Sequence, residues 1–242
     1  MPARRFFVAG THAAGDTVAI EGSDAHKIRS VLRLRDGDAI EIVDSAATLF
    51  AATLRVDAAT VSASLGSAAP RERGSRVSVD IAQGLPKGQK MDYVVEKLTE
   101  LGARAVLPVI TQRSVVRDAG DAKVERWRRL ARTAAQQCGR TTIPQIAEPV
   151  AFEDLLERFS HYDVVLFPWE VADPLPLRDE LPGLLAGAAS VLAVIGPEGG
   201  FSHEEAEAAR RAGAHVLSLG PSILRSETAG LALLAVLAYL TV

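Results

Sequence analysis

The chain has 242 residues, of which 48% are hydrophobic and 24% charged, with a mean hydropathy of +0.14. This composition excludes intrinsic disorder, a collagen-like repeat or a coiled coil as the dominant state, and the length suits one large domain or two modest ones. The net charge of −3, from 27 Lys and Arg against 30 Asp and Glu, taken alone argues against a nucleic-acid partner.

The N-terminal part of the chain has the pattern of a small β-rich domain with one helix. The helix is indicated by Ile28, Val31 and Leu32, which place apolar side chains at i, i+3 and i+4. Short β-type runs surround it, and turn residues such as those at 35–38 separate them. The strands expected here are residues 4–8, 17–20, 39–43, 49–56 and 60–65.

A polar stretch rich in small residues, 66–75, is the expected linker between a domain at 1–70 and a domain at 76–242. After it the pattern alternates between strand and helix, and the expected strands 163–167 and 191–195 are continuous apolar runs apart from Asp163 at the start of the first. This predicts an open parallel α/β sheet with both faces covered, which binds ligands beyond the carboxyl ends of its strands. The other expected strands are 77–82, 105–109 and 215–219, and the expected helices are 89–101, 121–138, 202–212 and 226–240.

Cysteine usage and hydropathy indicate the compartment. The single cysteine, Cys138, cannot form an intramolecular disulfide, and no Cys/His cluster has metal-ligand spacing, so we expect a reducing cytoplasm and no metal. The apolar run near the N-terminus, 6–9, is far shorter than the apolar core of a signal peptide. The most apolar run, 229–240, has about twelve residues where a membrane span needs about twenty, so we expect a buried C-terminal helix and no membrane partner.

The junction at 194–205 joins an apolar strand to a helix through a loop with three glycines. Such a loop lets the backbone approach a ligand closely, and Ser202 with Glu205 has the spacing of a capping box. The same features suit a well-capped connection in any α/β protein, so both interpretations stay open. The loop is neither G-x-G-x-x-G nor a phosphate loop with Lys-Ser/Thr, and it does not favour dinucleotide or nucleoside-triphosphate binding.

The junction at 217–230 has apolar residues in a loop. Ser226 can cap the helix that follows, and Glu227 suits the positive end of the helix dipole. Neither effect explains why Ile223 and Leu224 occupy the loop. Their presence there predicts that they line a pocket for an apolar ring.

At these two junctions the chain resembles the RsmE methyltransferases of the SPOUT superfamily. The resemblance rests on Ile-Gly-Pro-Glu-Gly-Gly-Phe-Ser at 195–202 and on Leu-Gly-Pro-Ser-Ile-Leu-Arg-Ser-Glu-Thr-Ala at 219–229, where the family more often has Thr at the position of Ser226. It extends over nearly the whole chain. The other matching segments are 4–8, 26–33, 37–38, 87–92, 96–102, 113–114, 123–127 and 137–140.

The resemblance implies a fold and a cofactor. The second domain is expected to be a SPOUT-type parallel sheet tied into a C-terminal trefoil knot, and the first a PUA-like RNA-binding β-barrel. S-adenosyl-L-methionine is the implied cofactor, bound in the loops of the knot, with glycine backbones reading the adenine edge and aliphatic side chains enclosing its ring. The implied cofactor residues are Leu166, Ile195, Gly196, Pro197, Glu198, Gly199, Gly200, Leu219, Gly220, Ile223 and Leu224.

The implied activity is methyl transfer to N3 of the uridine at position 1498 of 16S ribosomal RNA, within the assembled small subunit. Uracil N3 carries a proton at neutral pH, so a base or a favourable field must assist. We expect Arg225 to stabilise charge on a uracil oxygen, and Glu198 or Glu227 to orient the base or accept the proton. The alternatives are a SPOUT enzyme for another RNA such as tRNA, a non-catalytic RNA-binding assembly factor, or a metabolic α/β enzyme.

Two segments of the chain are basic, so an RNA partner is possible although the net charge of the whole chain is negative. Residues 113–140 hold eight basic against three acidic side chains, and residues 1–35 hold six against three. Arg29 and Arg33 at i and i+4 are expected to share one helix face. The resemblance also implies a homodimer of the knotted domains, with the C-terminal helix as a candidate for the interface. The expected RNA-binding residues are Arg4, Arg5, Arg29, Arg33, Lys87, Lys90, Arg113 and Arg140.

Overall fold

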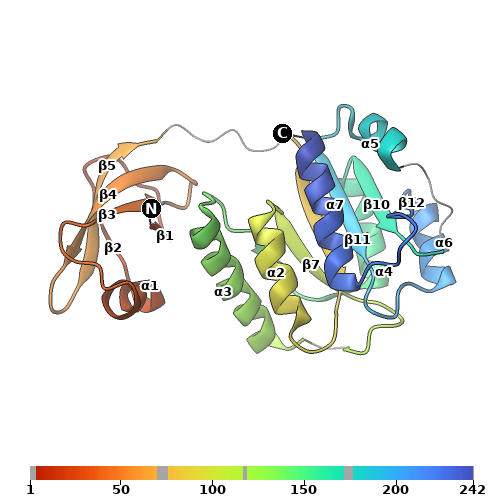
Figure 1. Cartoon of the computed structure of the whole chain (residues 1–242), viewed down its shortest axis with the longest axis horizontal. Helices are drawn as coiled ribbons and strands as arrows, with labels where there is room; N and C mark the ends of the chain where they lie inside the picture. The colour runs from red at the N-terminus through yellow and green to blue at the C-terminus, as the bar shows by residue number, and fades with distance from the viewer. Residues whose placement is uncertain (1–3, 70–75, 117–118, 172–176, 242) are drawn as a thin grey trace. The chain divides into compact units, whose positions relative to one another are not determined.

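The computed structural model describes residues 4–69, 76–116, 119–171 and 177–241. The chain divides into two compact units (Figure 1). Unit 1 comprises Met1–Arg73 with Ala135–Thr142, and unit 2 comprises Gly74–Ala134 with Ile143–Val242. Each unit has its own sheet and is described by itself.

Unit 1 contains a five-stranded sheet in the order β1-β3-β4-β5-β2. The pairing of β1 with β3 is parallel and the other pairings are antiparallel. Along β4 the side chains of Phe50, Ala52 and Leu54 are buried and alternate with more exposed ones, as expected for a strand with one face on a core. The sheet curls as a half-barrel from β1 to β2. Its strands are Arg5–Phe7, Thr17–Ala19, Ala39–Val43, Leu49–Val56 and Val61–Ala68, numbered β1 to β5 in chain order.

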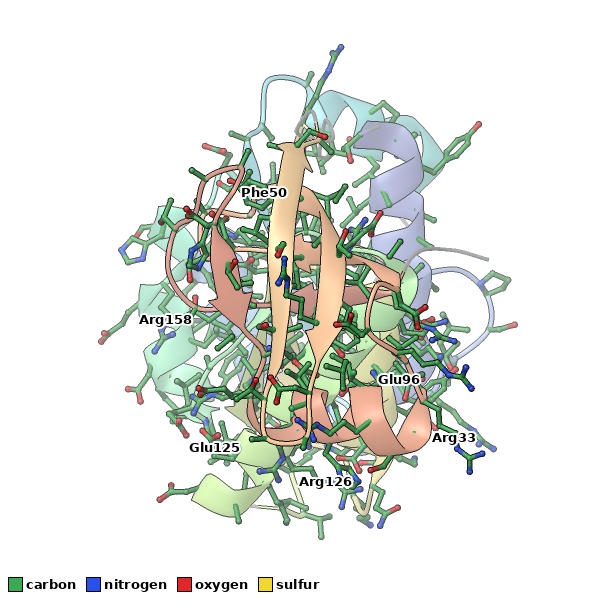
Figure 2. All side chains as sticks on the ribbon, turned by 90° about the vertical axis from the view of Figure 1, so that its left-hand side faces the viewer. Arg33, Phe50, Glu96, Glu125, Arg126 and Arg158 are labelled. Atoms are coloured by element: carbon green, nitrogen blue, oxygen red, sulfur yellow. The ribbon has the colours of Figure 1, made fainter. Side chains whose placement is uncertain are left out.

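The helical segment of unit 1 differs from the expectation at its C-terminal end. It consists of α1 (Gly22–His26) and one π-helical turn, Lys27–Val31. Arg33 lies beyond the helix with a φ of 52° and extends into solvent (Figure 2). The prediction that Arg29 and Arg33 share a helix face is therefore wrong, because the helix ends at Val31 and the backbone of Arg33 is in the left-handed region.

The expected linker at 66–75 is also partly corrected. Strand β5 continues to Ala68, because its backbone stays paired with β4 as far as Phe50 opposite Ala68. Residues 70–75 lie outside the described part of the chain.

Unit 2 is built on a seven-stranded sheet in which every described pairing is parallel, as the alternating pattern predicts. The order is β12-β10-β11-β6-β7-β8, and β9 also pairs with β7. The chain leaves β6 toward β7 but returns on its other side, so β6 and β11 flank a switch point of the kind where open α/β sheets bind ligands. The strands are β6 Ser78–Gly84, β7 Ala105–Ile110, β8 Gln145–Ile146, β9 Val150–Ala151, β10 Val164–Pro168, β11 Ser190–Ile195 and β12 His215–Leu217.

Helices cover both faces of this sheet, which explains why its inner strands β10 and β11 are almost entirely apolar. Alternate strand residues enter two hydrophobic clusters, so that Leu166 faces one and Phe167 the other. The first cluster packs under α2, α3, α5 and α7, and the second under α4 and α6; α2 and α7 lie together on one face (Figure 1). The helices are α2 Lys90–Glu100, α3 Asp121–Cys138, α4 Phe152–Glu157, α5 Leu177–Leu185, α6 His203–Arg211 and α7 Ser226–Thr241, with a 3-10 turn at Phe159–His161.

Candidate active site

A cavity of about 470 Å³ lies beyond the carboxyl ends of β10, β11 and β12. Three loops line it, at 168–170, 195–201 and 218–225, together with the start of α7 and the side chain of Lys90. The junctions at 194–205 and 217–230 therefore meet at one cavity. Its volume is within the range of about 300 to 1,000 Å³ typical of small-molecule sites.

Glycines in and beside the loop at 195–201 are required by close packing. A Cβ added to Gly84 would lie 2.5 Å from the backbone nitrogen of Pro197, and one added to Gly196 would lie 3.2 Å from the ring of Phe201. Gly200 has a φ of 65°, and a Cβ there would overlap the carboxylate of Glu170. The backbone beside Gly84 and the buried ring beside Gly196 leave no room for a side chain, and the positive φ of Gly200 favours glycine there.

A buried hydroxyl joins the two junction loops. Ser226 Oγ donates a hydrogen bond to the carbonyl oxygen of Gly196 at 2.5 Å, and it accepts one from Gln83 Nε2 at 2.8 Å. Ser226 and Gln83 are both buried. Because a threonine would also supply this hydroxyl, the difference from the usual family residue preserves the contact.

The capping box predicted at the start of α6 is present. Ser202 Oγ accepts from the Glu205 amide at 3.2 Å, and Glu205 accepts from the Ser202 amide at 2.9 Å. The other carboxylate oxygen of Glu205 accepts from the Gln112 amide at 2.8 Å, and Arg113 Nη1 donates to the Gly199 carbonyl at 3.1 Å. The loop after β7 is thus attached to the loop after β11.

Four charged residues form what we call the charged cluster: Lys90, Glu198, Arg225 and Glu227. Lys90 Nζ lies 3.0 Å from Glu198 Oε1 and 3.3 Å from Glu227 Oε2. Glu198 also accepts a hydrogen bond from the Lys87 amide at 3.1 Å. Arg225 lines the cavity, and its guanidinium makes no hydrogen bond or ion pair with the described residues.

These contacts set the protonation of the cluster. Burial acts to raise the pKa of Glu198, but hydrogen bonds from its own backbone, Lys90 and the Lys87 amide together lower it below its ordinary value of 4.5. The hydrogen bond to Glu198 is the largest cause of the raised pKa of Lys90, and Glu227 adds to it. At neutral pH the cluster therefore contains an ionised Glu198 and a cationic Lys90.

Most predicted cofactor residues line the cavity. We call Ile195, Leu219, Ile223 and Leu224, with the backbone at 196–200, the apolar cradle. Ile223 is 83% exposed although it is apolar, which suits a residue that a ligand covers. Leu166 is not among the lining residues, because the alternation of β10 directs its side chain into the hydrophobic core, where it is fully buried. Of the predicted catalytic residues, Arg225 and Glu198 line the cavity, and Glu227 reaches it through Lys90.

Trp169 and Glu170 also line the cavity, although neither is among the predicted site residues. Trp169 is buried, and its indole N–H has no hydrogen-bond partner within the described part of the chain. Their position in the sequence indicates the cavity, because they directly follow β10, the strand that pairs with β11.

The predicted RNA-binding residues have different surroundings. Lys90 and Arg113 belong to or adjoin the cavity, and Lys87 has an exposed side chain beside it. Arg5 is buried, pairs with Glu41 at 2.8 Å and donates to the Gly139 carbonyl, so a phosphate contact would require that pairing to open. The others lie in unit 1: Arg4 is half-buried, Arg33 is exposed, Arg29 donates to the Ala58 carbonyl at 2.9 Å, and Arg140 donates to Thr142 Oγ1 at 3.1 Å.

The cavity fits the adenosine part of the cofactor that the sequence implies. The apolar cradle supplies aliphatic contacts and backbone groups, and the Trp169 N–H is a buried donor in need of an acceptor. No group of three or more His, Cys, Asp and Glu in the described ranges could hold a metal ion. None of the described helices is long and apolar enough to cross a membrane.

Comparisons with known proteins point to one family. Residues 73–238 match the RNA methyltransferase domain family. The chain is 32% identical over 234 residues to the ribosomal RNA small subunit methyltransferase E of Bacillus subtilis, covering 93% of this chain and 91% of that protein. The protein of the same name from Synechocystis is 30% identical, covering 94% and 74%.

Two solved structures with S-adenosylmethionine bound are similar over almost their whole length. The ribosomal RNA small subunit methyltransferase E of Neisseria gonorrhoeae has a TM-score of 0.87 at 27% identity, covering 98% of each chain. A methyltransferase structure from Legionella pneumophila has a TM-score of 0.87 at 29% identity, covering 99% of this chain and 98% of that one.

Proposed function

Because this chain belongs to the ribosomal RNA small subunit methyltransferase E family, we propose that it transfers a methyl group from S-adenosylmethionine to N3 of the uridine at position 1498 of 16S ribosomal RNA. The observation that carries the proposal is the meeting of the apolar cradle and the charged cluster in one cavity. The cradle suits an adenine ring, and the cluster offers cations for a substrate that gains negative charge during the reaction.

The cofactor would be held by the loops at 195–200 and 219–224. Ile195, Leu219 and Leu224 would contact the faces of the adenine, and the backbone of the glycine loop would hydrogen-bond its edge. When bound, S-adenosylmethionine supplies a methyl group activated by its sulfonium, a chemistry that requires no metal. The remaining task of this chain is to bring uracil N3 into line and to favour its deprotonated form.

Two cations are available for that task. Arg225 lines the cavity with a guanidinium that is unpaired within the described residues, and Lys90 remains protonated because its pKa is raised. We place Arg225 at a uracil oxygen, where it would stabilise the charge that develops as the N3 proton leaves. Lys90 would add to the same positive field.

The carboxylates fit an orienting role better than that of a strong base. Efficient general bases have a pKa near the working pH, whereas the pKa of Glu198 is lowered below 4.5. Glu198 and Glu227 both contact Lys90, so we propose that they fix its ammonium and orient the uracil. Proton acceptance by Glu227 is the alternative assignment.

The two-domain organisation is part of the proposal. We assign residues 1–70 to a PUA-like RNA-binding barrel and 76–242 to the SPOUT methyltransferase domain with its trefoil knot. The five-stranded sheet of unit 1 and the return of the chain from the edge strand β12 to α7, against β6 and β11, support these assignments. The target within an assembled small subunit makes the cytoplasm the expected compartment.

We further propose a homodimer in which α7 contributes to the interface. Helix α7 is apolar around most of its circumference, so some of its apolar side chains are exposed. Val236 and Leu240 are about 40% exposed and Tyr239 is 85% exposed. A second copy that covers this side would remove these side chains from water.

The proposal is tested by incubating the purified protein with methyl-labelled S-adenosylmethionine and three substrates: small ribosomal subunits from a strain lacking this methylation, free 16S RNA and bulk tRNA. We expect label in small subunits. Label in tRNA alone would favour another RNA target, and cofactor binding without transfer to any of the three would favour a non-catalytic assembly factor.

A further inference from the structure

Glu170 supplies a further carboxylate to the lining of the cavity. It lies two residues beyond the end of β10 and is exposed. Its carboxylate forms no hydrogen bond or ion pair with the described residues. Glu198, Glu205 and Glu227, by contrast, each contact a donor. Glu198 and Glu227 have roles in the proposed mechanism and Glu205 caps α6, which leaves Glu170 without a role.

The position of Glu170 follows from the sheet. Strand β10 pairs with β11 in parallel, so the loops that follow the two strands emerge at the same edge. The Glu170 carboxylate lies against Gly200, at a place where any side chain on Gly200 would overlap it. The acidic group is therefore adjacent to the glycine loop of the apolar cradle, and the buried N–H of Trp169 is next to it in the chain.

We propose that Glu170 accepts hydrogen bonds from the ribose hydroxyls of the cofactor, an inference that rests on the proposed function. A carboxylate at the end of the strand beside a glycine-rich loop takes this role in doubly wound nucleotide-binding sheets. Here the glycine loop follows β11, and Glu170 follows its neighbour β10. The ribose is the cofactor group attached directly to the adenine, and the two hydroxyls can both donate to one carboxylate.

Calorimetry with S-adenosylhomocysteine and its 2′-deoxy and 3′-deoxy analogues tests this proposal without relying on turnover. The native chain should bind at least one deoxy analogue about tenfold more weakly than the parent compound, because a hydrogen bond to a charged group is lost. The Glu170→Ala variant should bind the parent about tenfold more weakly and should no longer distinguish it from that analogue. Glu170→Gln should be intermediate.

Glu153→Ala, at an exposed position on α4, is the matched control and should retain the native discrimination. Unchanged thermal unfolding of Glu170→Ala would establish that its fold is intact. If Glu170→Ala retained the native preference for the hydroxyls, the proposal would be overturned.

A second ligand pair separates the other outcomes. 5′-Methylthioadenosine lacks the amino-acid part of S-adenosylhomocysteine, and Glu170→Ala should leave the affinity ratio of these two compounds unchanged. A changed ratio with intact hydroxyl discrimination would assign Glu170 to the ammonium group and overturn the ribose assignment. Failure of the native chain to bind S-adenosylhomocysteine or S-adenosylmethionine would instead contradict the proposed function.

Discussion

The apolar cradle and the charged cluster share one cavity but are held by different forces. In the cradle, backbone meets backbone so closely that a Cβ on Gly84 would come within 2.5 Å of Pro197. In the charged cluster, Lys90 joins Glu198 and Glu227 through partly exposed side chains at 3.0 and 3.3 Å. A closely packed region tolerates little change in side-chain volume, whereas partly exposed ion pairs contribute little to the free energy of unfolding. Changes in the cradle should therefore affect folding and cofactor affinity, and changes in the cluster should affect turnover.

The largest effect is expected from Gly84→Ala. The added methyl would overlap the backbone at 196–197, so we expect a loss of about 1 to 3 kcal/mol in unfolding free energy and at least a hundredfold loss of cofactor affinity. Gly183→Ala is the control, because a Cβ at that helical glycine meets nothing within 4 Å and should be neutral or slightly stabilising. Denaturant titration would measure the unfolding free energy of each variant, and calorimetry its cofactor affinity. Near-native cofactor binding by Gly84→Ala would show that the close contact with Pro197 does not shape the cofactor site.

Arg225→Ala should separate the two parts of the cavity most clearly. Loss of a group that stabilises developing charge typically lowers kcat by about a hundredfold or more, and the cofactor Kd should change less than threefold. Single-turnover methylation would measure the loss of rate, and calorimetry on the same preparation would measure the cofactor Kd. Equal losses in turnover and cofactor affinity would place Arg225 with the cradle.

Ser226 tests the connection between the junction loops. Removing its hydroxyl in Ser226→Ala leaves the buried Gln83 amide and the Gly196 carbonyl without this partner, so we expect a loss of about 1 to 3 kcal/mol in stability. Ser226→Thr retains the hydroxyl and should stay close to native in thermal unfolding and cofactor affinity. Equal behaviour of the two variants would show that the bridge is not important.

The smallest effect concerns pH. The pKa of Glu198 is lowered in the folded chain, so its contribution to stability is complete above pH 4.5 and is lost as the pH falls through the folded value. We expect Glu198→Gln to reduce the pH dependence of unfolding on the acid side, with no change between pH 6 and 8. The pH profile of kcat in that range should also keep its shape, and a profile that lost its acid limb in this variant would restore Glu198 as the base.

Much of the fold was predictable because the pattern is strong in long elements. The limits of β3, β4 and α3 agree with the expectation at both ends, since each has a clear period of two or 3.6 and a turn or glycine nearby. Strands β8 and β9 have two residues each, too few to show a period, and α4 and α5 were also missed. Strand β12 was predicted two residues too long, because Ser218 and Leu219 already turn into the cavity loop.

The site was predictable where residues are close in sequence and less so where they are distant. The loops at 195–200 and 219–225 carry their own signal in glycines and misplaced apolar residues. The bridge from Lys90 to Glu227 joins residues 137 positions apart, and no local pattern indicates it. Leu166 is a predicted cofactor residue, but strand alternation directs its side chain into the core, and Glu170, four residues later, lines the cavity instead.

The most direct test is nucleoside mass spectrometry of 16S RNA from a strain that lacks this methylation, complemented with either the native chain or Arg225→Ala at equal protein levels. We expect N3-methyluridine at position 1498 with the native chain and a strong reduction with the variant. Full methylation by Arg225→Ala, or a methyl group from the native chain at any other nucleotide, would contradict the claim that this cavity performs that reaction.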